Sequence, residues 1–285
     1  MKLGILITKH TDEAKLLFKT IATSIKPKDS HVYIKDISHY EKEKRNCDCF
    51  LAIGWYNENH LWAETIFRKS AYDDIIAAGK KVIIVDTGYL RNSYSPVKEQ
   101  RKYISFGING YKAFGQFYNE NSSPERFLAS GIKIKPWQEY GENILVIGQN
   151  LNGTSVDIDI FKWHTDIIKK LKKLYNNPIV FREHPRGKLE VNRAEFPFDI
   201  KYSTSKYIQE DLGNCAAVFG YSSNALCETL LEGISTFSLG KAAMTYKLKG
   251  SRPEREQFFY DLMYCHWNLE EIKAGLWWKH LRKHI

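Results

Sequence analysis

Two short segments in the second half of the chain carry side chains that could bind an anion. The first is Phe219-Gly220-Tyr221-Ser222-Ser223-Asn224, which follows an apolar run and leads into residues 225–233, where leucines recur at helical spacing. This pattern predicts a strand, a tight turn and a helix, with two hydroxyls at the helix start. Free N–H groups and hydroxyls at such a place can hold a phosphate. The alternative is an ordinary serine cap in an α/β domain.

The second segment is Pro178–Gly187, in which Arg182, His184 and Pro185 follow an apolar run. Pro185 ends the predicted strand and favours an extended backbone at His184, at the carboxyl end where open α/β sheets place their ligands. His184 could donate a hydrogen bond to a phosphate, and Arg182 or Arg186 could add positive charge. The alternative is a structural loop histidine, and two such strand ends in one sheet are a better signal than either alone.

The first half of the chain offers a carboxylate at a strand end. Asp86 directly follows the apolar run Val82–Val85, so it is a candidate general base at a sheet edge. The alternative, equally compatible with this position, is an Asx-turn residue that opens a loop with Gly88.

The elements that must position these residues alternate between strands and helices, which indicates parallel α/β architecture. The first series predicts strands at 3–7, 32–34, 50–53 and 81–85, with helices at 12–25 and 62–78. Residues 86–140 lack periodicity and are expected to form a long functional loop. The second series predicts strands at 144–147, 179–184, 216–219 and 235–239, with helices at 159–175, 205–212, 226–232, 253–264 and 269–284.

We therefore predict an α/β protein with two Rossmann-like domains facing a cleft, the GT-B architecture. Residues 1–138 are expected to bind an acceptor and residues 139–285 a nucleotide sugar, with the last helix able to return to the first domain. The chain has 285 residues, of which 43% are hydrophobic, enough for two cores. Five cysteines without a CxxC pair indicate free thiols.

The net charge of +9 favours polyanionic partners such as nucleotide phosphates, nucleic acid or acidic glycans. The lysines at 169, 170, 172 and 173 offer a simpler source of this excess, the solvated face of one helix. No apolar run approaches the roughly 20 residues of a membrane helix, and the first residues are typical of a strand rather than a signal peptide. We therefore expect a protein without an integral membrane segment, in the cytoplasm of a bacterium or a phage-infected cell.

Several common catalytic motifs are absent from the sequence. It has no GxGxxG, GxxxxGK[ST], GxSxG or HExxH pattern. Asp157-Ile158-Asp159 spells a metal-binding DxD, but carboxylates favoured at a helix start explain it more simply, so no metal site is predicted. The remaining interpretation is a GT-B glycosyltransferase without a metal or cofactor, in which helix N-termini and basic side chains stabilise the leaving phosphate of a UDP- or CMP-linked sugar.

Four segments resemble those of the capsule-polysaccharide biosynthesis glycosyltransferases, the Kdo transferases. Val85–Arg91 resembles their Glu-Asp-Gly-Phe-(Leu/Ile)-Arg signature, and Ile144–Gln149 followed by Thr154-Ser155 resembles their strand-Gly-Gln-Ser segment. Ile179–Pro185 resembles their His-Pro motif, and Tyr221–Gly233 their serine motif. Bacterial sialyltransferases and polysialyltransferases carry a similar set. The resemblance covers roughly residues 80 to 240.

This resemblance implies that Asp86 is the base, that His184 contacts the nucleotide phosphate, and that Ser222 and Ser223 bind the phosphate or a charged group of the sugar. The donor-binding candidates are Gln149, Thr154, Ser155, Arg182, His184, Ser222, Ser223, Asn224 and Glu228. Glu228 could hold a ribose hydroxyl or be an exposed helix residue, and we prefer the exposed alternative. Thr87 departs from the family's acidic pair, so if the second acid is the base, the activity or the acceptor differs.

The stretch from Arg101 to Arg126 interleaves basic and aromatic residues in an expected loop. Such a surface could contact phosphates and stack on a displaced base, and it resembles segments of proteins of bacterial viruses, in which sugar transferases modify hydroxymethylated pyrimidines. The acceptor-binding candidates are Arg91, Arg101, Lys102, Tyr103, Asn109 and Tyr111. The alternative is that the aromatics pack in the core between the domains.

Three hypotheses for function follow. The first is sugar transfer to a 5-hydroxymethylpyrimidine base in double-stranded DNA, which the positive charge and missing membrane segment favour. The second, close behind, is Kdo- or sialyl-type transfer to a capsule or lipopolysaccharide glycan. The third is a non-catalytic nucleotide- or DNA-binding module.

Overall fold

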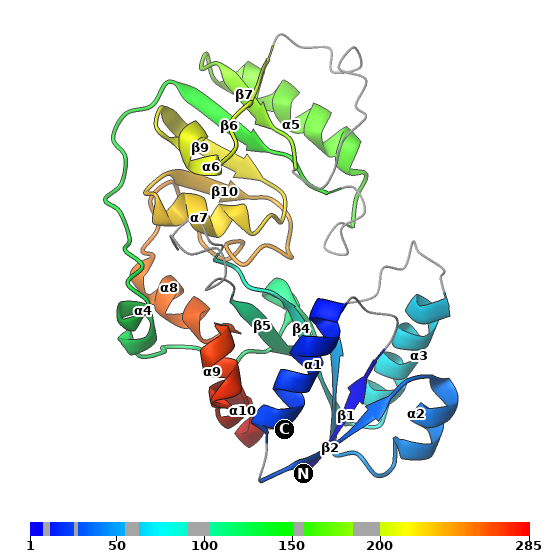
Figure 1. Ribbon diagram of the computed structural model, residues 1–285. Coiled ribbons are helices and arrows are strands. Elements are labelled where there is room, and N and C mark those ends of the chain that lie inside the picture. The colour runs from blue at the N-terminus through cyan, green and yellow to red at the C-terminus, as the bar shows by residue number, and fades with distance from the viewer. Residues whose placement is uncertain (8–11, 26–27, 55–62, 91–102, 151–156, 185–199) are drawn as a thin grey trace. The chain divides into compact units, whose positions relative to one another are not determined.

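The computed structural model describes residues 1–7, 12–25, 28–54, 63–90, 103–150, 157–184 and 200–285 (Figure 1). The chain divides into two compact units. Unit 1 comprises Met1–Phe127 and Phe259–Ile285, and unit 2 comprises Leu128–Phe258. This division differs from the predicted boundary after residue 138. Its physical reason lies in helix α4 (Glu125–Ala129), where Phe127 packs against Phe259 at 6.1 Å and Tyr260 at 5.6 Å between ring centroids.

Unit 1 is built on a six-stranded sheet in the order β11-β5-β4-β3-β1-β2. The strands β1 (Lys2–Leu6), β2 (Ser30–Ile34), β3 (Cys49–Ile53) and β4 (Lys81–Thr87) are parallel, whereas β5 (Ile104–Ile108) and β11 (His266–Trp267) are antiparallel to their neighbours. The helices are α1 (Asp12–Ser24), α2 (Ile37–Glu43), α3 (Ala63–Ala77), α9 (Leu269–Lys273) and α10 (Leu276–Leu281), together with most of α4 and most of α8 (Glu256–Met263).

Apolar side chains that alternate along the central strands form two apolar cores in unit 1, one on each face of the sheet. In β3, Cys49 and Leu51 join the core that includes α1 and α10, whereas Phe50 and Ala52 join the core that includes α2 and α3. Successive side chains of a strand point to opposite faces, and both faces here are covered. This is why β3 reads as one continuous apolar run.

The C-terminal segment is part of unit 1, beside the first strands. The ring of Trp277 in α10 stacks on Phe106 of β5, with centroids 4.5 Å apart. The buried carboxylate of Asp29 accepts hydrogen bonds from the Met1 amino group (2.7 Å), Trp278 Nε1 (2.8 Å) and Arg282 Nε (2.7 Å). Charged and apolar contacts thus fasten both ends of the chain to one unit.

Unit 2 contains a fully parallel five-stranded sheet in the order β10-β9-β6-β7-β8. Its strands are β6 (Asn143–Ile147), β7 (Ile179–Arg182), β8 (Lys201–Tyr202), β9 (Cys215–Gly220) and β10 (Ser235–Ser238), and its helices include α5 (Ile160–Leu174), α6 (Ile208–Leu212) and α7 (Ala225–Leu231). Counted from β6, the order is 3-2-1-4-5, which is the Rossmann order, and its topological switch point lies between β6 and β9.

Helix α5 illustrates how the sequence forms these elements. Asp159 caps the helix by accepting a hydrogen bond from the Lys162 N–H at 2.9 Å, and the last turn carries Lys172 and Lys173, which favour the negative end of the helix dipole. The lysines at 169, 170, 172 and 173 are all exposed, as predicted for a solvated face.

The main error in the predicted elements concerns the stretch expected to be a long loop. Part of it is strand β5, which pairs with β4 from Ile83–Ile108 to Thr87–Ile104. The strand β4 also extends through Thr87, so Asp86 lies within a strand rather than after it. Within the described residues, no helix has both the length and the apolar character needed to cross a membrane.

Candidate functional site

The carboxyl ends of β6, β7 and β9 lie next to one another at the switch point of unit 2. Ile147 of β6 is paired with Arg182 of β7 on one side and with Gly220 of β9 on the other. Beyond these pairs the three segments that the sequence singled out leave the same edge of the sheet. In open α/β sheets this edge, at the switch point, is where nucleotides bind.

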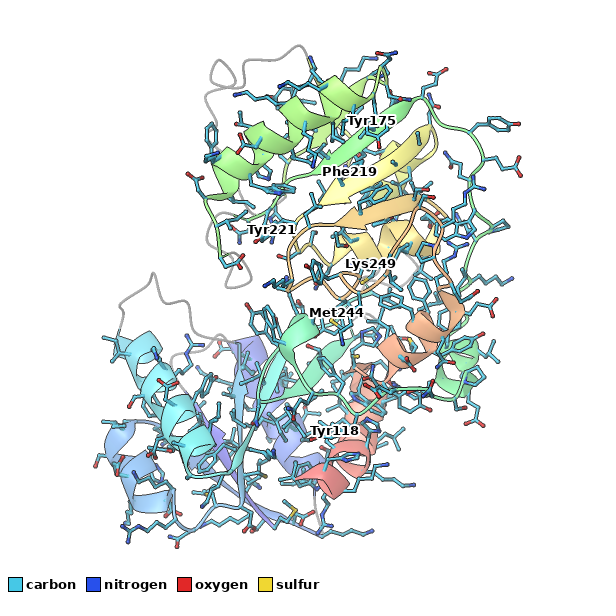
Figure 2. The ribbon with its side chains drawn as sticks, turned by 180° about the vertical axis from the view of Figure 1, so that it is seen from behind. Tyr118, Tyr175, Phe219, Tyr221, Met244 and Lys249 are labelled. Carbon is cyan, nitrogen blue, oxygen red and sulfur yellow. The ribbon has the colours of Figure 1, made fainter. Side chains whose placement is uncertain are left out.

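Gln149 joins two of these strand ends. Its side-chain Oε1 accepts a hydrogen bond from the backbone N–H of Ser222 at 3.3 Å, and both residues are buried. Tyr221 lies between β9 and Ser222 (Figure 2). Its hydroxyl donates a hydrogen bond to the carboxylate of Asp157. The polar side chain of Gln149 therefore spans the switch point itself.

A residue that the sequence analysis missed fixes Gln149 in turn. His164 of α5 is fully buried, and its Nε2 accepts a hydrogen bond from the backbone N–H of Gln149 at 3.1 Å. The sequence does hold a signal for it, because His164 occupies a position in the apolar stripe of α5, four residues after Ile160 and four before Ile168. A histidine in such a stripe must find its hydrogen-bond partners inside the protein, and among the described residues Nε2 has one whereas the buried Nδ1 does not.

We expect acid pH to destabilise unit 2 through His164. Burial lowers the pKa of His164 from its ordinary 6.5 to about 4. As the pH falls, the unfolded chain therefore binds a proton at this histidine before the folded protein does. The free energy of unfolding is unaffected by His164 above about pH 6.5 and decreases by up to about 3 kcal/mol as the pH drops towards 4. His164→Gln keeps an acceptor without this titration, so urea unfolding at pH 7, 5.5 and 4 should show a smaller pH dependence. Equal pH dependence in the two proteins would refute this role.

His184 lies at the same edge, just beyond β7. The backbone there passes close to Gly148, whose N–H donates to the Arg182 carbonyl at 2.7 Å. A Cβ atom on Gly148 would lie 2.9 Å from that carbonyl oxygen and 3.2 Å from the His184 nitrogen. Glycine therefore permits the two strand ends to approach, and half-buried His184 follows directly.

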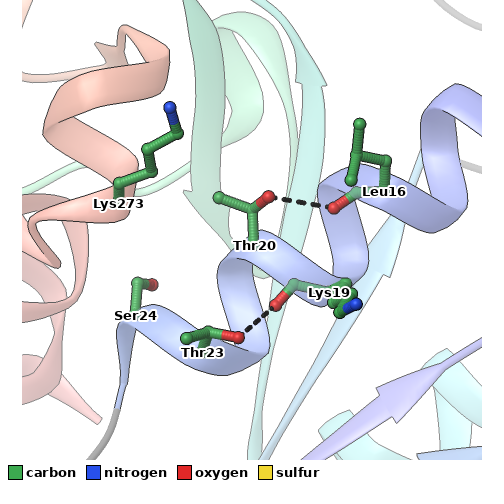
Figure 3. A pocket seen from close by; sticks show the side chains of 6 residues that line it. All are labelled: Leu16, Lys19, Thr20, Thr23, Ser24 and Lys273. Carbon is green, nitrogen blue, oxygen red and sulfur yellow. Dashed lines mark hydrogen bonds between the residues drawn. The ribbon is translucent and has the colours of Figure 1, made fainter.

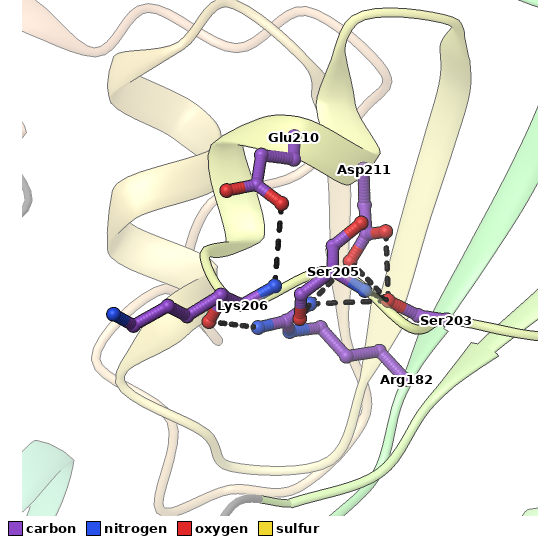
Figure 4. A network of polar contacts seen from close by, with 6 residues as sticks. All are labelled: Arg182, Ser203, Ser205, Lys206, Glu210 and Asp211. Carbon is purple, nitrogen blue, oxygen red and sulfur yellow. Dashed lines mark hydrogen bonds and ion pairs between the residues drawn. The ribbon is translucent and has the colours of Figure 1, made fainter.

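The charge of Arg182 is already paired within unit 2 (Figure 4). Its guanidinium forms an ion pair with Asp211 at 2.5 Å and also donates to the hydroxyl of Ser203 at 3.1 Å and the carbonyls of Ser205 and Lys206. Asp211 of α6 neutralises the guanidinium, and the other three acceptors belong to the connection between β8 and α6. The side chain therefore holds β7 to that connection and to α6, and the donor-binding role of Arg182 stays a prediction for a guanidinium that is already ion-paired.

The serine segment after β9 is partly buried. Ser222 is only 1% exposed, whereas Ser223 is half-buried and its Oγ accepts from the Ala225 N–H at 3.3 Å. Asn224, rather than a serine, is the residue that precedes helix α7, and its side chain makes no capping hydrogen bond. Of the two hydroxyls, that of Ser223 is the one at the surface.

Glu228 is 4% exposed, so the preferred alternative of an exposed helix residue is wrong. The two carboxylates of the DxD segment have structural roles, since Asp159 caps α5 and Asp157 accepts from Tyr221. Among the residues that the structure describes, no group of three or more His, Cys, Asp or Glu is placed to hold a metal ion. The donor-binding candidates Thr154 and Ser155 lie outside the described residues.

In unit 1, Asp86 is partly exposed at the penultimate position of β4. Its Oδ1 accepts from the Thr87 N–H at 2.7 Å, and the next N–H, of Gly88, donates to the Tyr103 carbonyl at 2.8 Å. A Cβ atom on Gly88 would lie 2.5 Å from the Tyr103 oxygen, so only glycine fits there. A carboxylate that solvent can reach is thus held at the carboxyl end of a strand.

Two acceptor-binding candidates make contacts within unit 1, where one is half-buried and the other is buried. Asn109, with φ of 56°, accepts from the Val82 N–H at 3.0 Å, and Tyr111 is 5% exposed in an apolar core. Val82 is the second residue of β4, so Asn109 lies at the opposite edge from Asp86, about 13 Å away along the strand. Tyr103 is half-buried on the Asp86 side. The candidates Arg91, Arg101 and Lys102 lie outside the described residues.

A separate surface hollow of about 280 Å³ lies between α1 and α9 (Figure 3). Its residues are Leu16, Lys19, Thr20, Thr23, Ser24 and Lys273. The hydroxyls of Thr20 and Thr23 donate to the carbonyls of Leu16 and Lys19 within their own helix, at 3.0 and 2.9 Å. These hydroxyls therefore form hydrogen bonds within α1, and none of the candidate site residues lines the hollow.

Two Rossmann-like units in one chain define a GT-B-like α/β fold. No family model matches the chain, and a search of curated proteins finds no match. Among solved structures, the chain is similar to KpsC of Thermosulfurimonas dismutans, a beta Kdo 2,7 transferase, with 11% identity, a TM-score of 0.58 and coverage of 97% of this chain and 99% of that one.

Two further solved structures are similar at lower TM-scores. The UDP-GlcNAc 2-epimerase of Methanocaldococcus jannaschii, in complex with UDP-GlcNAc and UDP, has 11% identity, full coverage of both chains and a TM-score of 0.37. MurG of Acinetobacter baumannii has 8% identity, a TM-score of 0.30 and coverage of 92% of this chain and 82% of that one. The likeness to KpsC establishes the fold but not the activity. The TM-scores of the other two structures are too low to support a conclusion.

Proposed function

We propose that the protein is a metal-independent glycosyltransferase that moves a sugar from a nucleotide-sugar donor to a hydroxyl acceptor. The observation that carries this proposal is the switch point of unit 2, where Gln149 is hydrogen-bonded to Ser222 beside the strand end that leads to His184. Parallel sheets of this order bind nucleotides at that edge, where backbone N–H groups and a histidine can contact a phosphate.

In the proposed reaction Asp86 takes the proton of the acceptor hydroxyl while the hydroxyl oxygen attacks the anomeric carbon of the sugar. The bond from that carbon to the phosphate oxygen breaks, and its electron pair leaves with the nucleotide. His184 and the N–H groups of the switch point stabilise the negative charge that develops on the phosphate. A partly exposed carboxylate at a strand end supports the role given to Asp86.

For the acceptor we propose a bacterial capsule or lipopolysaccharide glycan, and for the donor a CMP-linked acidic sugar. The fold likeness to a Kdo transferase and the resemblance of four sequence segments to the same class support this choice. Transfer to a hydroxymethylated base in DNA had relied on a basic and aromatic surface. Asn109 and Tyr111, two of the residues proposed for that surface, instead stabilise unit 1.

The test is protection of the protein against heat by nucleotides. We expect CMP, at about a hundred times its Kd, to add about 2.7 kcal/mol of stability and to raise Tm by roughly 5 °C, with UDP giving less. His184→Ala should weaken CMP binding by roughly 10- to 100-fold, the value of a hydrogen bond to a charged group, while Tm without nucleotide changes little. His39→Ala, on α2 of unit 1, is the control and should keep full protection.

Protection by neither nucleotide would refute the proposal, and protection by UDP alone would overturn the CMP assignment. If His184→Ala lowered Tm sharply while CMP affinity stayed the same, the histidine would be structural. Tight binding to duplex DNA that weakens steeply with salt would favour the DNA acceptor over the glycan.

A further inference from the structure

The C-terminal segment brings a buried histidine to the row of residues that contains Asp86. In β4 and β5, Asp86 is paired with Ser105, and Ser105 is paired in turn with His266 of β11. Directly opposed residues of antiparallel strands project from the same face of the sheet. Asp86, Ser105 and His266 therefore form one row across three strands, with roughly 10 Å between its ends because neighbouring strands lie about 4.8 Å apart.

His266 acts on the turn after Asp86 rather than on the carboxylate itself. Its Nδ1 accepts a hydrogen bond from the backbone N–H of Tyr89 at 3.2 Å, and the side chain is fully buried. The imidazole stacks on the ring of Tyr103 at 4.3 Å and lies 5.9 Å from that of Tyr89. Burial, assisted by the positive charge of Arg126, lowers the pKa of His266 well below 6.5, so Nδ1 remains an acceptor at neutral pH.

Tyr89 is held at its other end as well. Its hydroxyl accepts from the Lys112 N–H at 3.1 Å, while the nearby Ser105 hydroxyl donates to the Thr87 carbonyl at 3.3 Å. Its ring is completely buried and packs edge-to-face on Phe117 at 6.1 Å. With the hydroxyl end of Tyr89 held by the Lys112 N–H and its ring packed in the interior, the bond to His266 determines how the backbone leaves β4.

The backbone between Asp86 and Tyr89 transmits this constraint. The Asp86 carboxylate is bonded to the Thr87 N–H, and the Gly88 N–H is bonded to the Tyr103 carbonyl. Without the acceptor on His266 the Tyr89 N–H would be left buried and unpaired, which costs about 1–3 kcal/mol, enough to shift the turn. The turn and the carboxylate would then move together.

We propose that His266 is a positioning residue of the transfer reaction, which holds the Thr87–Tyr89 turn so that the Asp86 carboxylate faces the acceptor hydroxyl. This role depends on the proposed function, because it presumes that Asp86 is the base. It also gives the C-terminal segment a part in the chemistry, since the segment returns to unit 1 and supplies β11.

The test compares two substitutions of different chemistry. His266→Phe keeps the ring that stacks on Tyr103 but removes the acceptor, whereas His266→Asn places Oδ1 near the position of Nδ1. We expect His266→Phe to lower kcat by roughly 10- to 100-fold, because small misplacements of a catalytic group cost that much. The Kd of the nucleotide-sugar donor should not change. His266→Asn should recover most of the kcat.

Hydrogen–deuterium exchange supplies a readout that does not need activity. In the wild-type protein the Tyr89 amide should exchange as slowly as those within β4, and in His266→Phe it should exchange at least roughly tenfold faster. His266→Asn should restore the protection. The wild-type measurement holds even if His266→Phe does not fold, because a rapidly exchanging Tyr89 amide in the wild type would overturn the proposal.

The outcomes separate this role from the proposed function. A folded His266→Phe protein with full kcat, or a kcat loss that His266→Asn does not recover, refutes the positioning role and leaves the transferase proposal standing. A wild-type protein that transfers no sugar from any nucleotide donor refutes the proposed function and the role in transfer with it. Slow exchange at Tyr89 would in that case still confirm the hydrogen bond.

Discussion

Replacing Asp86 with asparagine is expected to lower the rate of sugar transfer by roughly 10²- to 10⁴-fold, which is the usual contribution of general acid–base catalysis. Asparagine has nearly the same shape and keeps an oxygen that can accept from the Thr87 N–H, as Oδ1 of Asp86 does at 2.7 Å. It has no basicity, so the acceptor hydroxyl would keep its proton. The measurement is kcat for transfer, with the Kd of the donor determined in parallel.

The Kd of the donor and the Tm of the protein should be nearly unchanged in Asp86→Asn, because the nucleotide is expected at unit 2 and no buried group is lost. Asp73→Asn is the matched control. Asp73 is a carboxylate of the same unit, 55% exposed and paired with Lys69 on α3, and its loss should leave transfer intact. A loss of less than about tenfold in Asp86→Asn would mean that another group accepts the proton.

The same experiment decides whether the protein is an enzyme at all. A non-catalytic nucleotide-binding module would bind the donor without transferring or hydrolysing it, before and after the substitution. Transfer that disappears in Asp86→Asn while the donor Kd stays the same would exclude such a module. It would also assign the base to Asp86, since Thr87, which stands where the resembling family has a second acid, cannot serve as one.

The elements around the switch point of unit 2 could be predicted because local chemistry defines them. The strands 144–147 and 216–219 were predicted from apolar runs, and the structure extends them to Asn143–Ile147 and Cys215–Gly220. Gly233, predicted to end the helix after the serines, has φ of 80° and follows Glu232, the C-cap of α7. Parallel strands buried on both faces leave such continuous apolar signals.

The strands of unit 1 that pair over long separations left weaker signals. The strand β5 is Ile-Ser-Phe-Gly-Ile, five residues with a glycine and a serine, and β11 has only two residues. Neither run is long enough to show a period, and β11 pairs with a partner about 160 positions earlier. Their existence depends on tertiary contacts, which is why the row from Asp86 to His266 could not be derived from the sequence.

The hydrogen-bond and ion-pair partners of the candidate functional residues could not be predicted, for a related reason. Arg182 was expected to face a phosphate because it carries charge at a strand end, but Asp211, 29 positions later, neutralises it. Asn109 has a backbone with positive φ and a side chain bonded to Val82, which is 27 positions earlier. Charge and residue type indicate that a side chain needs a partner, and only the fold determines which partner it meets.

Removing the charge of Asp29 is expected to cost unit 1 about 3 kcal/mol of stability. The Asp29 carboxylate is fully buried and bonded to the Met1 amino group, Trp278 and Arg282, so Asp29→Asn leaves donors facing an amide nitrogen. Breaking a buried ion pair costs about 3–5 kcal/mol, and the low end applies because Arg282 is 43% exposed and can be rehydrated. Urea unfolding at pH 7, followed by tryptophan fluorescence, measures the loss.

The pH dependence of this contribution has a definite sign. The Arg282 guanidinium, with the Met1 amino group and Trp278, holds the pKa of Asp29 well below its ordinary 3.8. The unfolded chain therefore takes up the proton first, so the contribution is complete above about pH 4 and decreases as the pH falls below that value. Asp29→Asn lacks this titration, so its stability should decrease less than that of the wild type between pH 4 and pH 2.

Asp48→Asn is the control for Asp29, since Asp48 is an exposed carboxylate of the same unit that accepts from the Lys2 N–H at 2.7 Å. An exposed acceptor can be replaced by water, so Asp48→Asn should cost less than about 1 kcal/mol. Equal losses in the two variants would contradict a special role for the buried carboxylate. Because Trp278 and Arg282 belong to the segment that carries β11, a specific loss in Asp29→Asn should also release His266. Exchange at the Tyr89 amide should then rise in Asp29→Asn but not in Asp48→Asn.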